Sequence, residues 1–190
     1  MPVPTAVLVP VKAFDQAKLR LAPALDASAR AELARAMASH VVRAAGSLPV
    51  AVVCDDHEVA TWAREMGASV IWRPGRGLNG AVEDGVRELA DAGHARVIVA
   101  HADLPHAGAF AWVADFDGIT LVPDRREDGT NVVCVPAGAP FVFAYGPGSF
   151  ARHTAEAERI GVAVRVVREP TLGWDVDVPD DLTRPEWLVG

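Results

Sequence analysis

Short apolar runs alternate with amphipathic stretches along almost the whole chain, and this alternation limits the possible folds more than any other feature. The apolar runs, rich in β-branched residues, lie at 7–11, 50–53, 69–72, 96–100, 118–122, 131–135, 141–143 and 162–167. Helical spacing of apolar side chains occurs at 28–45, 57–66, 80–92 and 149–160. Runs that are apolar on both faces predict the buried strands of a parallel sheet. Residues 1–190 are therefore expected to form one α/β domain with a mostly parallel sheet.

The composition is that of a soluble globular chain, with 51% hydrophobic and 23% charged residues. No apolar run reaches the roughly 18–20 residues that span a bilayer. The start, MPVPTAVLVPVK, lacks the features of a signal peptide, so we expect a cytoplasmic protein. A net charge of −7 argues against nucleic-acid binding but leaves a small anionic substrate open. Cys54 and Cys134 fit no zinc or disulfide pattern and are expected in the core.

A basic loop follows the first apolar run. Lys12, Lys18 and Arg20 lie in it, and Asp26 and Ser28 then indicate the cap of a long helix. The free N–H groups and the dipole at a helix N-terminus favour an anion, and lysine and arginine add full charges. We interpret the loop as a phosphate site. An ordinary solvated loop is the alternative, because no known P-loop or dinucleotide fingerprint is present.

Acidic side chains follow two of the predicted strands. Asp55 and Asp56 are expected to cap the helix that begins near His57, in preference to binding a metal. Asp103 follows the run at 96–100, and ligands of α/β proteins bind at the carboxyl ends of such strands. Asp103 is therefore either the cap of a helix that begins at Pro105 or a magnesium ligand.

A second acidic pair lies near the end of the chain. Asp175 and Asp177 are two residues apart, so on an extended segment they face the same side. Two adjacent carboxylates repel each other unless a cation lies between them, which makes this pair a candidate metal site. Asp180 and Asp181 are expected to cap a final short helix.

Two glycine-rich loops open predicted helices. The loop 73–80 allows close approach of backbone to a flat ligand, and Asn79 is either the cap of the next helix or part of a base-reading loop. In the second loop, Arg152 and His153 lie in the first helical turn, where positive charge opposes the dipole unless an anion sits nearby. This favours an anion site near Ser149.

Together these motifs resemble the phospholactate or phosphoenolpyruvate guanylyltransferases of the coenzyme F-420 pathway, which belong with the molybdenum-cofactor guanylyltransferases and sugar-nucleotide pyrophosphorylases. The resemblance rests on VPVKAFDQAKLRLAP, RGLNGAV, ADLP, DGTN, FAYGPGSFARH and WDVDVPDDL. ADLP and DVDVP are shared with the wider group. The chain departs from the family at His101, at Gly148 and in the charged run 125–128. The resemblance implies a three-layer αβα sandwich with a Rossmann-like sheet of the nucleotide-diphospho-sugar transferase type.

The resemblance also assigns roles to residues. It implies nucleotide binding and catalysis by Lys12 and Lys18, and catalysis with magnesium ligation by Asp103. The implied guanine and ribose pocket contains Leu78 and Asn79. The remaining implied residues are the metal ligands Asp175 and Asp177 and the acceptor-binding residues Thr130, Gly146 and Ser149.

The implied reaction is Mg²⁺-dependent transfer of GMP from GTP to the phosphate of a three-carbon acid, with release of pyrophosphate. The acid is phosphoenolpyruvate or 2-phospho-L-lactate, which the sequence does not separate. Because a phosphate monoester is already an anion, attack on the α-phosphorus needs no strong base, and the chain offers no convincing catalytic triad. The alternatives are a transferase for 3-phosphoglycerate, molybdopterin or a sugar phosphate, and a non-catalytic nucleotide-binding module. A homodimer is expected by family resemblance.

Overall fold

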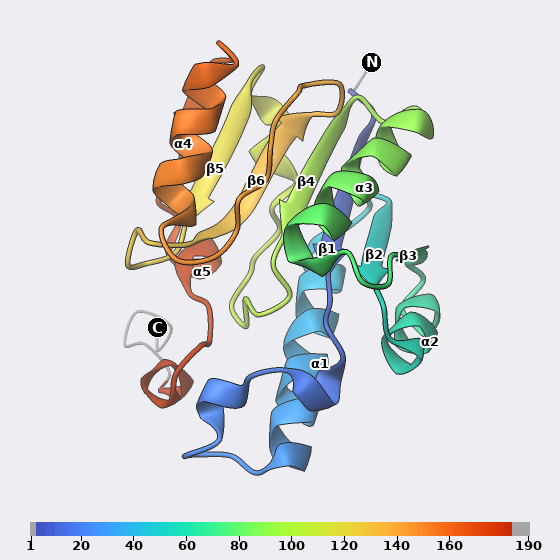
Figure 1. The fold of residues 1–190 in the computed structure, drawn as a ribbon, viewed down its shortest axis with the longest axis vertical. Coiled ribbons are helices and arrows are strands. Elements are labelled where there is room, and N and C mark those ends of the chain that lie inside the picture. The colour runs from blue at the N-terminus through green and yellow to red at the C-terminus, as the bar shows by residue number, and fades with distance from the viewer. Residues whose placement is uncertain (1–2, 184–190) are drawn as a thin grey trace.

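A seven-stranded sheet forms the centre of the computed structural model, which describes residues 3–183 (Figure 1). The strands are β1 (Thr5–Pro10), β2 (Val50–Cys54), β3 (Ser69–Trp72), β4 (Arg96–Ala100), β5 (Ile119–Pro123), β6 (Thr130–Pro136) and β7 (Val164–Val166). Their order in the sheet is β3-β2-β1-β4-β6-β5-β7. β6 runs antiparallel to both of its neighbours, whereas the other pairs are parallel. The predicted mostly parallel sheet is confirmed.

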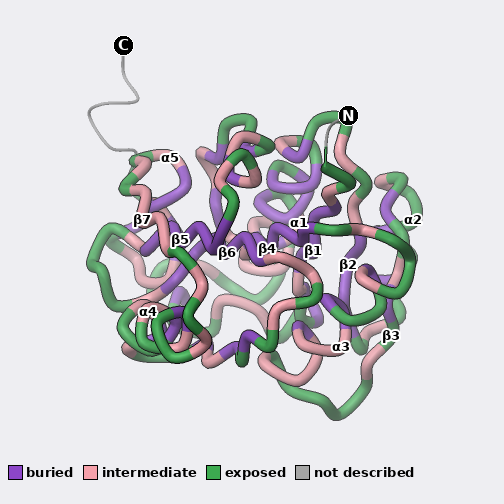
Figure 2. The backbone as a smooth tube through the Cα atoms, turned by 90° about the horizontal axis from the view of Figure 1, so that it is seen from above, coloured by how far each residue is buried: buried purple, intermediate pink, exposed green. Residues whose placement is uncertain are grey.

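Helices cover both faces of the sheet. The α-helices are α1 (Ala27–Ala44), α2 (His57–Glu65), α3 (Gly77–Asp91), α4 (Ser149–Arg159) and the short α5 (Pro170–Gly173). Figure 2 shows the buried strands as a row, with α1 on one side and α3 and α4 on the other. Alternate residues of β1 enter the two cores: Val7 and Val9 pack with α1 and α2, and Leu8 packs with α3. The three-layer αβα arrangement is therefore confirmed.

Capping and close packing fix the helices that surround the site. The Asp26 carboxylate accepts a hydrogen bond from the Ala29 N–H at 2.8 Å and caps α1. Asp56 caps α2 in the same way, through Val59 N–H at 3.0 Å. The caps at Asp26 and Asp56 were predicted, but Asp55, which was expected to share the cap of α2, does not cap it.

None of the helices in residues 3–183 is long and apolar enough to cross a membrane.

Connections between strands occupy the end of the sheet where β1 and β4 finish. Among residues 3–183, three short 3-10 segments lie in connections between strands, namely η1 (Phe14–Gln16), η2 (Leu19–Leu21) and η3 (Ala111–Asp115), and η4 (Pro179–Leu182) follows the last strand. η1 and η2 belong to the basic loop after β1. Figure 1 shows this loop and η4 beyond the same end of the strands. Segments from the two ends of the chain therefore meet there.

Three local predictions were wrong. Residues 141–143 form no strand, because both edges of β6 are already paired, with β4 and β5; Phe141 and Phe143 instead pack edge-to-face over the sheet, with ring centroids 5.1 Å apart. No helix begins at Pro105, and the next helical turn is η3. Asn79 does not cap a helix, because α3 already begins at Gly77. Asp180 and Asp181 were expected to cap the final short helix. Both lie within η4, and of the two Asp181 caps it, because its carboxylate accepts the N–H group of the N-cap residue Val178 as well as that of Asp177.

Candidate active site

A cavity of about 750 Å³ opens where β1, β2 and β4 end. Its walls come from the loop 10–20, the end of β2, the start of α3, residues 101–103 and Asp177. From β1 the chain passes to β2 on one side, and β4 pairs with β1 on the other side. Such a topological switch point is where open α/β sheets bind ligands. The volume also lies within the range of small-molecule sites.

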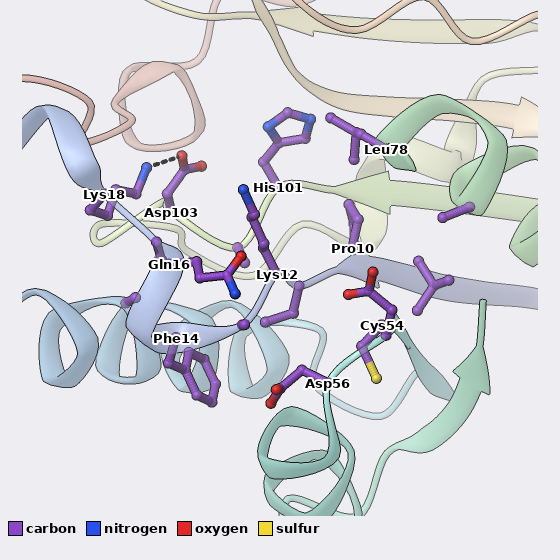
Figure 3. A pocket seen from close by; sticks show the side chains of 18 of the residues that line it. Pro10, Lys12, Phe14, Gln16, Lys18, Cys54, Asp56, Leu78, His101 and Asp103 are labelled. Carbon is purple, nitrogen blue, oxygen red and sulfur yellow. Dashed lines mark hydrogen bonds and ion pairs between the residues drawn. The ribbon is translucent and has the colours of Figure 1, made fainter. Parts of the chain in front are cut away.

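An ion-pair cluster forms one end of this cavity. The Lys18 ammonium is 2.5 Å from an Asp103 carboxylate oxygen and 3.2 Å from one of Asp177 (Figure 3 shows the Asp103 contact). The Arg20 guanidinium lies 3.6 Å from Asp177. Burial opposes the charges of Lys18 and Asp103, but the Asp103 and Asp177 carboxylates raise the pKa of Lys18, and Lys18 lowers the pKa of Asp103. Both groups are therefore ionised at neutral pH.

Asp175 carries an unfavourable charge beside this cluster. The residue is 8% exposed, and burial, with the charges of Asp103 and Asp177, raises the pKa of its carboxyl to about 6. One buried oxygen of Asp175 and one of Asp103 have no hydrogen-bond partner in the described structure. Buried carboxylate oxygens without a partner are costly, so this end of the site favours an additional cation.

The predicted magnesium ligands are therefore of the right chemical kind. Mg²⁺ prefers carboxylate oxygens, and the two unpartnered oxygens belong to predicted ligands. Across residues 3–183, however, no three His, Cys, Asp or Glu side chains are grouped closely enough to hold a metal ion as they stand. The Lys18 ammonium bridges Asp103 and Asp177 instead. Metal ligation by Asp103, Asp175 and Asp177 remains a prediction.

Two of the predicted nucleotide-binding residues besides Lys18 line the cavity. Lys12 and Leu78 lie in its wall, and Figure 3 shows both side chains near His101. Asn79 is not among the lining residues: its side-chain oxygen accepts a hydrogen bond from Tyr145 N–H at 2.7 Å. Asn79 thus ties the start of α3 to the segment before α4.

The predicted acceptor-binding residues meet next to the cavity. The hydroxyls of Thr130 and Ser149 are 3.4 Å apart, and both residues are buried. His153 Nε2 accepts from Ala144 N–H at 2.9 Å, which places the proton of the neutral ring on Nδ1, 3.0 Å from Thr130 Oγ1. Burial lowers the pKa of His153 to about 4, so the ring is neutral. Since Thr130 accepts this hydrogen bond, its own proton is available to another group.

A row of rings separates this cluster from the cavity. His101, which lines the cavity, packs on Tyr145 with ring centroids 4.7 Å apart, and Tyr145 packs on His153 at 4.9 Å. Gly146 is exposed and accepts a hydrogen bond from Ser149 N–H at 3.0 Å. The structure thus brings Thr130, Gly146 and Ser149 together, but these residues do not form the wall of the large cavity.

Arg152 and His153 do not require an anion, contrary to the prediction. The Arg152 guanidinium donates to the Ala144 carbonyl oxygen at 2.8 Å, so main-chain acceptors satisfy it. His153 is neutral. The Asp128 carboxylate already accepts from Gly148 N–H at 3.1 Å, at the start of α4. These contacts remove the argument that charge at the helix start indicates a bound anion.

One group that positions the site was not predicted. The buried Asp181 carboxylate binds Arg125 and Arg126 with one oxygen, and with the other it accepts the N–H groups of Asp177 and Val178 at 2.8 and 2.9 Å. Although burial opposes ionisation, these donors hold the pKa of Asp181 well below its usual value. The charged run at 125–128 was visible in the sequence, but nothing there linked it to Asp181.

The three-layer α/β arrangement is the fold of the nucleotide-diphospho-sugar transferases. The structure is similar to a putative nucleotide-diphospho-sugar transferase from Desulfovibrio desulfuricans G20, with a TM-score of 0.76 at 13% identity, over 93% of this chain and 83% of that one. It is also similar to a 4-diphosphocytidyl-2C-methyl-D-erythritol synthase, with a TM-score of 0.62 at 12% identity, over 100% and 97% of the two chains. The predicted fold type is confirmed.

Sequence comparison then identifies the family. The model described as "Guanylyl transferase CofC like" matches residues 5–186, and this chain belongs to that family. Two phosphoenolpyruvate guanylyltransferases are similar over nearly their whole length. The one from Rubrobacter xylanophilus is 38% identical, over 94% of this chain and 92% of the relative. The one from Sphaerobacter thermophilus is 36% identical, over 94% and 90%. The predicted family resemblance is confirmed.

Proposed function

We propose that this protein is a phosphoenolpyruvate guanylyltransferase of coenzyme F-420 biosynthesis, which transfers GMP from GTP to the phosphate of phosphoenolpyruvate and releases pyrophosphate. The observation that carries the proposal is its similarity, at 36–38% identity over nearly the full length, to relatives with that name. The basic loop at the topological switch point supports it. We expect a cytoplasmic homodimer whose small-molecule partners are GTP and phosphoenolpyruvate.

In this proposal the cations of the first loop bind the triphosphate. Lys12 and Lys18 lie in the cavity wall at the ends of β1 and β4. The main barrier to the reaction is repulsion between two anions and the growth of charge on the leaving pyrophosphate. Fixed ammonium groups lower that barrier because they are already oriented before charge develops. Asp103 and Asp177 hold the Lys18 ammonium in place.

Asp103, Asp175 and Asp177 would hold magnesium, which supplies charge neutralisation at the phosphate oxygens when it is bound. The acid is placed by Thr130, Gly146 and Ser149, whose hydroxyl and main-chain groups suit a carboxylate or a phosphate. The attacking phosphate oxygen is already ionised at neutral pH, so no residue is required to remove a proton. This agrees with the neutral, hydrogen-bonded His153.

The test is pyrophosphate release from GTP and Mg²⁺ with phosphoenolpyruvate, 2-phospho-L-lactate and 3-phosphoglycerate in parallel. We expect release with phosphoenolpyruvate and weaker release with the other acids. Preference for another acid would overturn the acceptor assignment. GTP binding without release with any acid would point to a non-catalytic nucleotide-binding module.

A further inference from the structure

The cavity has two chemically different ends. At the ends of β1 and β4 it is charged, with Lys12, Lys18 and Asp103 in its wall. Toward β2 and α3 the wall contains two apolar side chains: Pro10, the last residue of β1, which lies opposite Val53 of β2, and Leu78 in the first turn of α3. Figure 3 shows these two on the far side of Lys12 from the Lys18–Asp103 pair. A nucleotide whose phosphates bind the lysines therefore extends its base toward the end of β2.

Most polar side chains at the β2 end already have partners. Asp56 caps α2 through Val59 N–H. The Arg73 guanidinium pairs with Glu88 at 2.5 Å and with Asp84 at 3.7 Å. These contacts fix the surrounding elements and leave the two groups less able to read a ligand.

Asp55 differs from these neighbours. It follows Cys54, the last residue of β2, and its exposed side chain lines the cavity. Among residues 3–183 its carboxylate has no hydrogen-bond or ion-pair partner. Because β2 is an interior strand, paired with β1 and β3, the main chain directly before Asp55 is held firmly. Asp55 is thus an acceptor with two free oxygens, directly after a firmly held strand, at the base end of the cavity.

An ionised carboxylate only accepts hydrogen bonds, so it recognises a base edge with adjacent donors. Guanine offers such an edge, with N1–H beside the 2-amino group. Adenine has an acceptor at N1, cytosine has an acceptor at N3, and uracil has one N–H between two carbonyl groups. We propose that Asp55 selects guanine by accepting hydrogen bonds from N1–H and the 2-amino group. This inference rests on the proposed function, in which GTP is the donor.

The decisive variant is Asp55→Asn. Its amide keeps an acceptor for N1–H but presents a donor where the carboxylate accepted the 2-amino group. That pattern matches xanthine, which carries a carbonyl group at C2. With saturating phosphoenolpyruvate, we expect kcat/KM for GTP to fall by about 10- to 100-fold, as when a hydrogen bond to a charged group is lost. We expect kcat/KM for XTP to rise, so that the preference reverses. ITP, which lacks the 2-amino group, should lose less than GTP.

Asp56→Asn is the matched control, because it alters the adjacent acid in the same cavity wall and its amide oxygen still caps α2. It should keep the wild-type preference for GTP over XTP. Since Asp55 is exposed and unpaired, Asp55→Asn should melt at the wild-type temperature, which separates altered recognition from misfolding.

The failures are distinguishable. No pyrophosphate release by the wild-type protein with GTP would refute the proposed function. If the wild-type protein is active but Asp55→Asn keeps the wild-type ratio of kcat/KM for GTP to kcat/KM for XTP, the assignment of Asp55 alone is overturned. A variant that keeps its base preference but no longer distinguishes GTP from 2′-deoxy-GTP would also overturn it, because the carboxylate would then bind the ribose.

Discussion

Replacing Asp175 with asparagine should stabilise the metal-free protein while it impairs catalysis. Burial, followed by the charges of Asp103 and Asp177, raises the pKa of Asp175 from 3.8 to about 6. One pKa unit corresponds to about 1.36 kcal/mol, so ionisation of this carboxyl at neutral pH costs about 3 kcal/mol of folding free energy. Asparagine has nearly the same shape and no ionisation, so the variant avoids this cost.

The effect should depend on pH in a defined direction. The folded state binds the Asp175 proton more tightly than the unfolded state, so the destabilisation is complete above about pH 6 and absent below about pH 3.8. The advantage of Asp175→Asn should therefore be about 3 kcal/mol at pH 7.5, decline between pH 6 and 4, and vanish near pH 4. The wild-type protein gains stability from this group as the pH falls through that window.

Urea unfolding without divalent ions, at several pH values between 4 and 7.5, measures this difference. At pH 7.5 the melting temperature should rise by about 6–12 °C for a chain of this size. Asp177→Asn is the contrast, because it removes a partner of Lys18 and should bring no comparable gain. Added Mg²⁺ should stabilise the wild-type protein more than Asp175→Asn. The reasoning would be refuted if Asp175→Asn were less stable than the wild-type protein at pH 7.5, or if the difference in unfolding free energy did not change with pH.

Three further substitutions test the packing and the positioning of the site. Gly85→Ala should lower the free energy of unfolding by about 1–3 kcal/mol, because its Cβ would lie 2.7 Å from the Leu8 side chain of β1. Gly80→Ala is the control, since the nearest atom there is 3.4 Å away, at the end of a flexible arginine side chain. Chemical denaturation of both variants measures the difference. Asp181→Asn should cost about 1.5–3 kcal/mol, as when a hydrogen bond to a charged group is lost, because the two arginines it leaves are partly exposed to water. Pyrophosphate release should fall with it, and equal stability to wild type would contradict this. His153→Gln keeps an acceptor at the position of Nε2 but loses the hydrogen-bond donor to Thr130, so it should raise KM for phosphoenolpyruvate more than KM for GTP. His153→Asn keeps a donor near the position of Nδ1 and should not raise KM for phosphoenolpyruvate in this selective way.

The sequence predicted the sheet because the strands are apolar on both faces, a pattern that only a covered sheet satisfies. It misplaced a strand at residues 141–143 because periodicity reports burial and not pairing. Phe141 and Phe143 are buried, but β6 has no free edge for another strand. The prediction of a helix at Pro105 was wrong for a different reason. Proline favours the first turn of a helix, but no amphipathic stretch follows it to continue the helix.

The ion-pair cluster around Lys18 was partly predictable, because ligand-binding residues of an α/β sheet directly follow the carboxyl ends of its strands. Lys12 and Lys18 follow β1 and Asp103 follows β4, and the carboxyl ends of adjacent parallel strands meet at one edge of the sheet. Asp177 joins them from a distant segment, and the structure places it within 3.2 Å of Lys18. No sequence pattern predicts that Lys18 bridges the two carboxylates, because the contact depends on the path of a distant segment.

The contacts that orient Asp177 were beyond sequence reasoning, because they join segments about 55 residues apart and have no periodic signature. Asp181 would be costly as a lone buried carboxylate, and Arg125 and Arg126 would repel each other without it. The buried Asp181 charge is therefore tolerable only in the presence of the two arginines, whose side chains are partly exposed. With its second oxygen the Asp181 carboxylate accepts the N–H groups of Asp177 and Val178. The ion pairs that hold Asp181 in place therefore also fix the main chain that carries Asp177. Arg125 and Arg126, from the charged run 125–128 that departs from the family pattern, thereby support the main chain of the acidic segment.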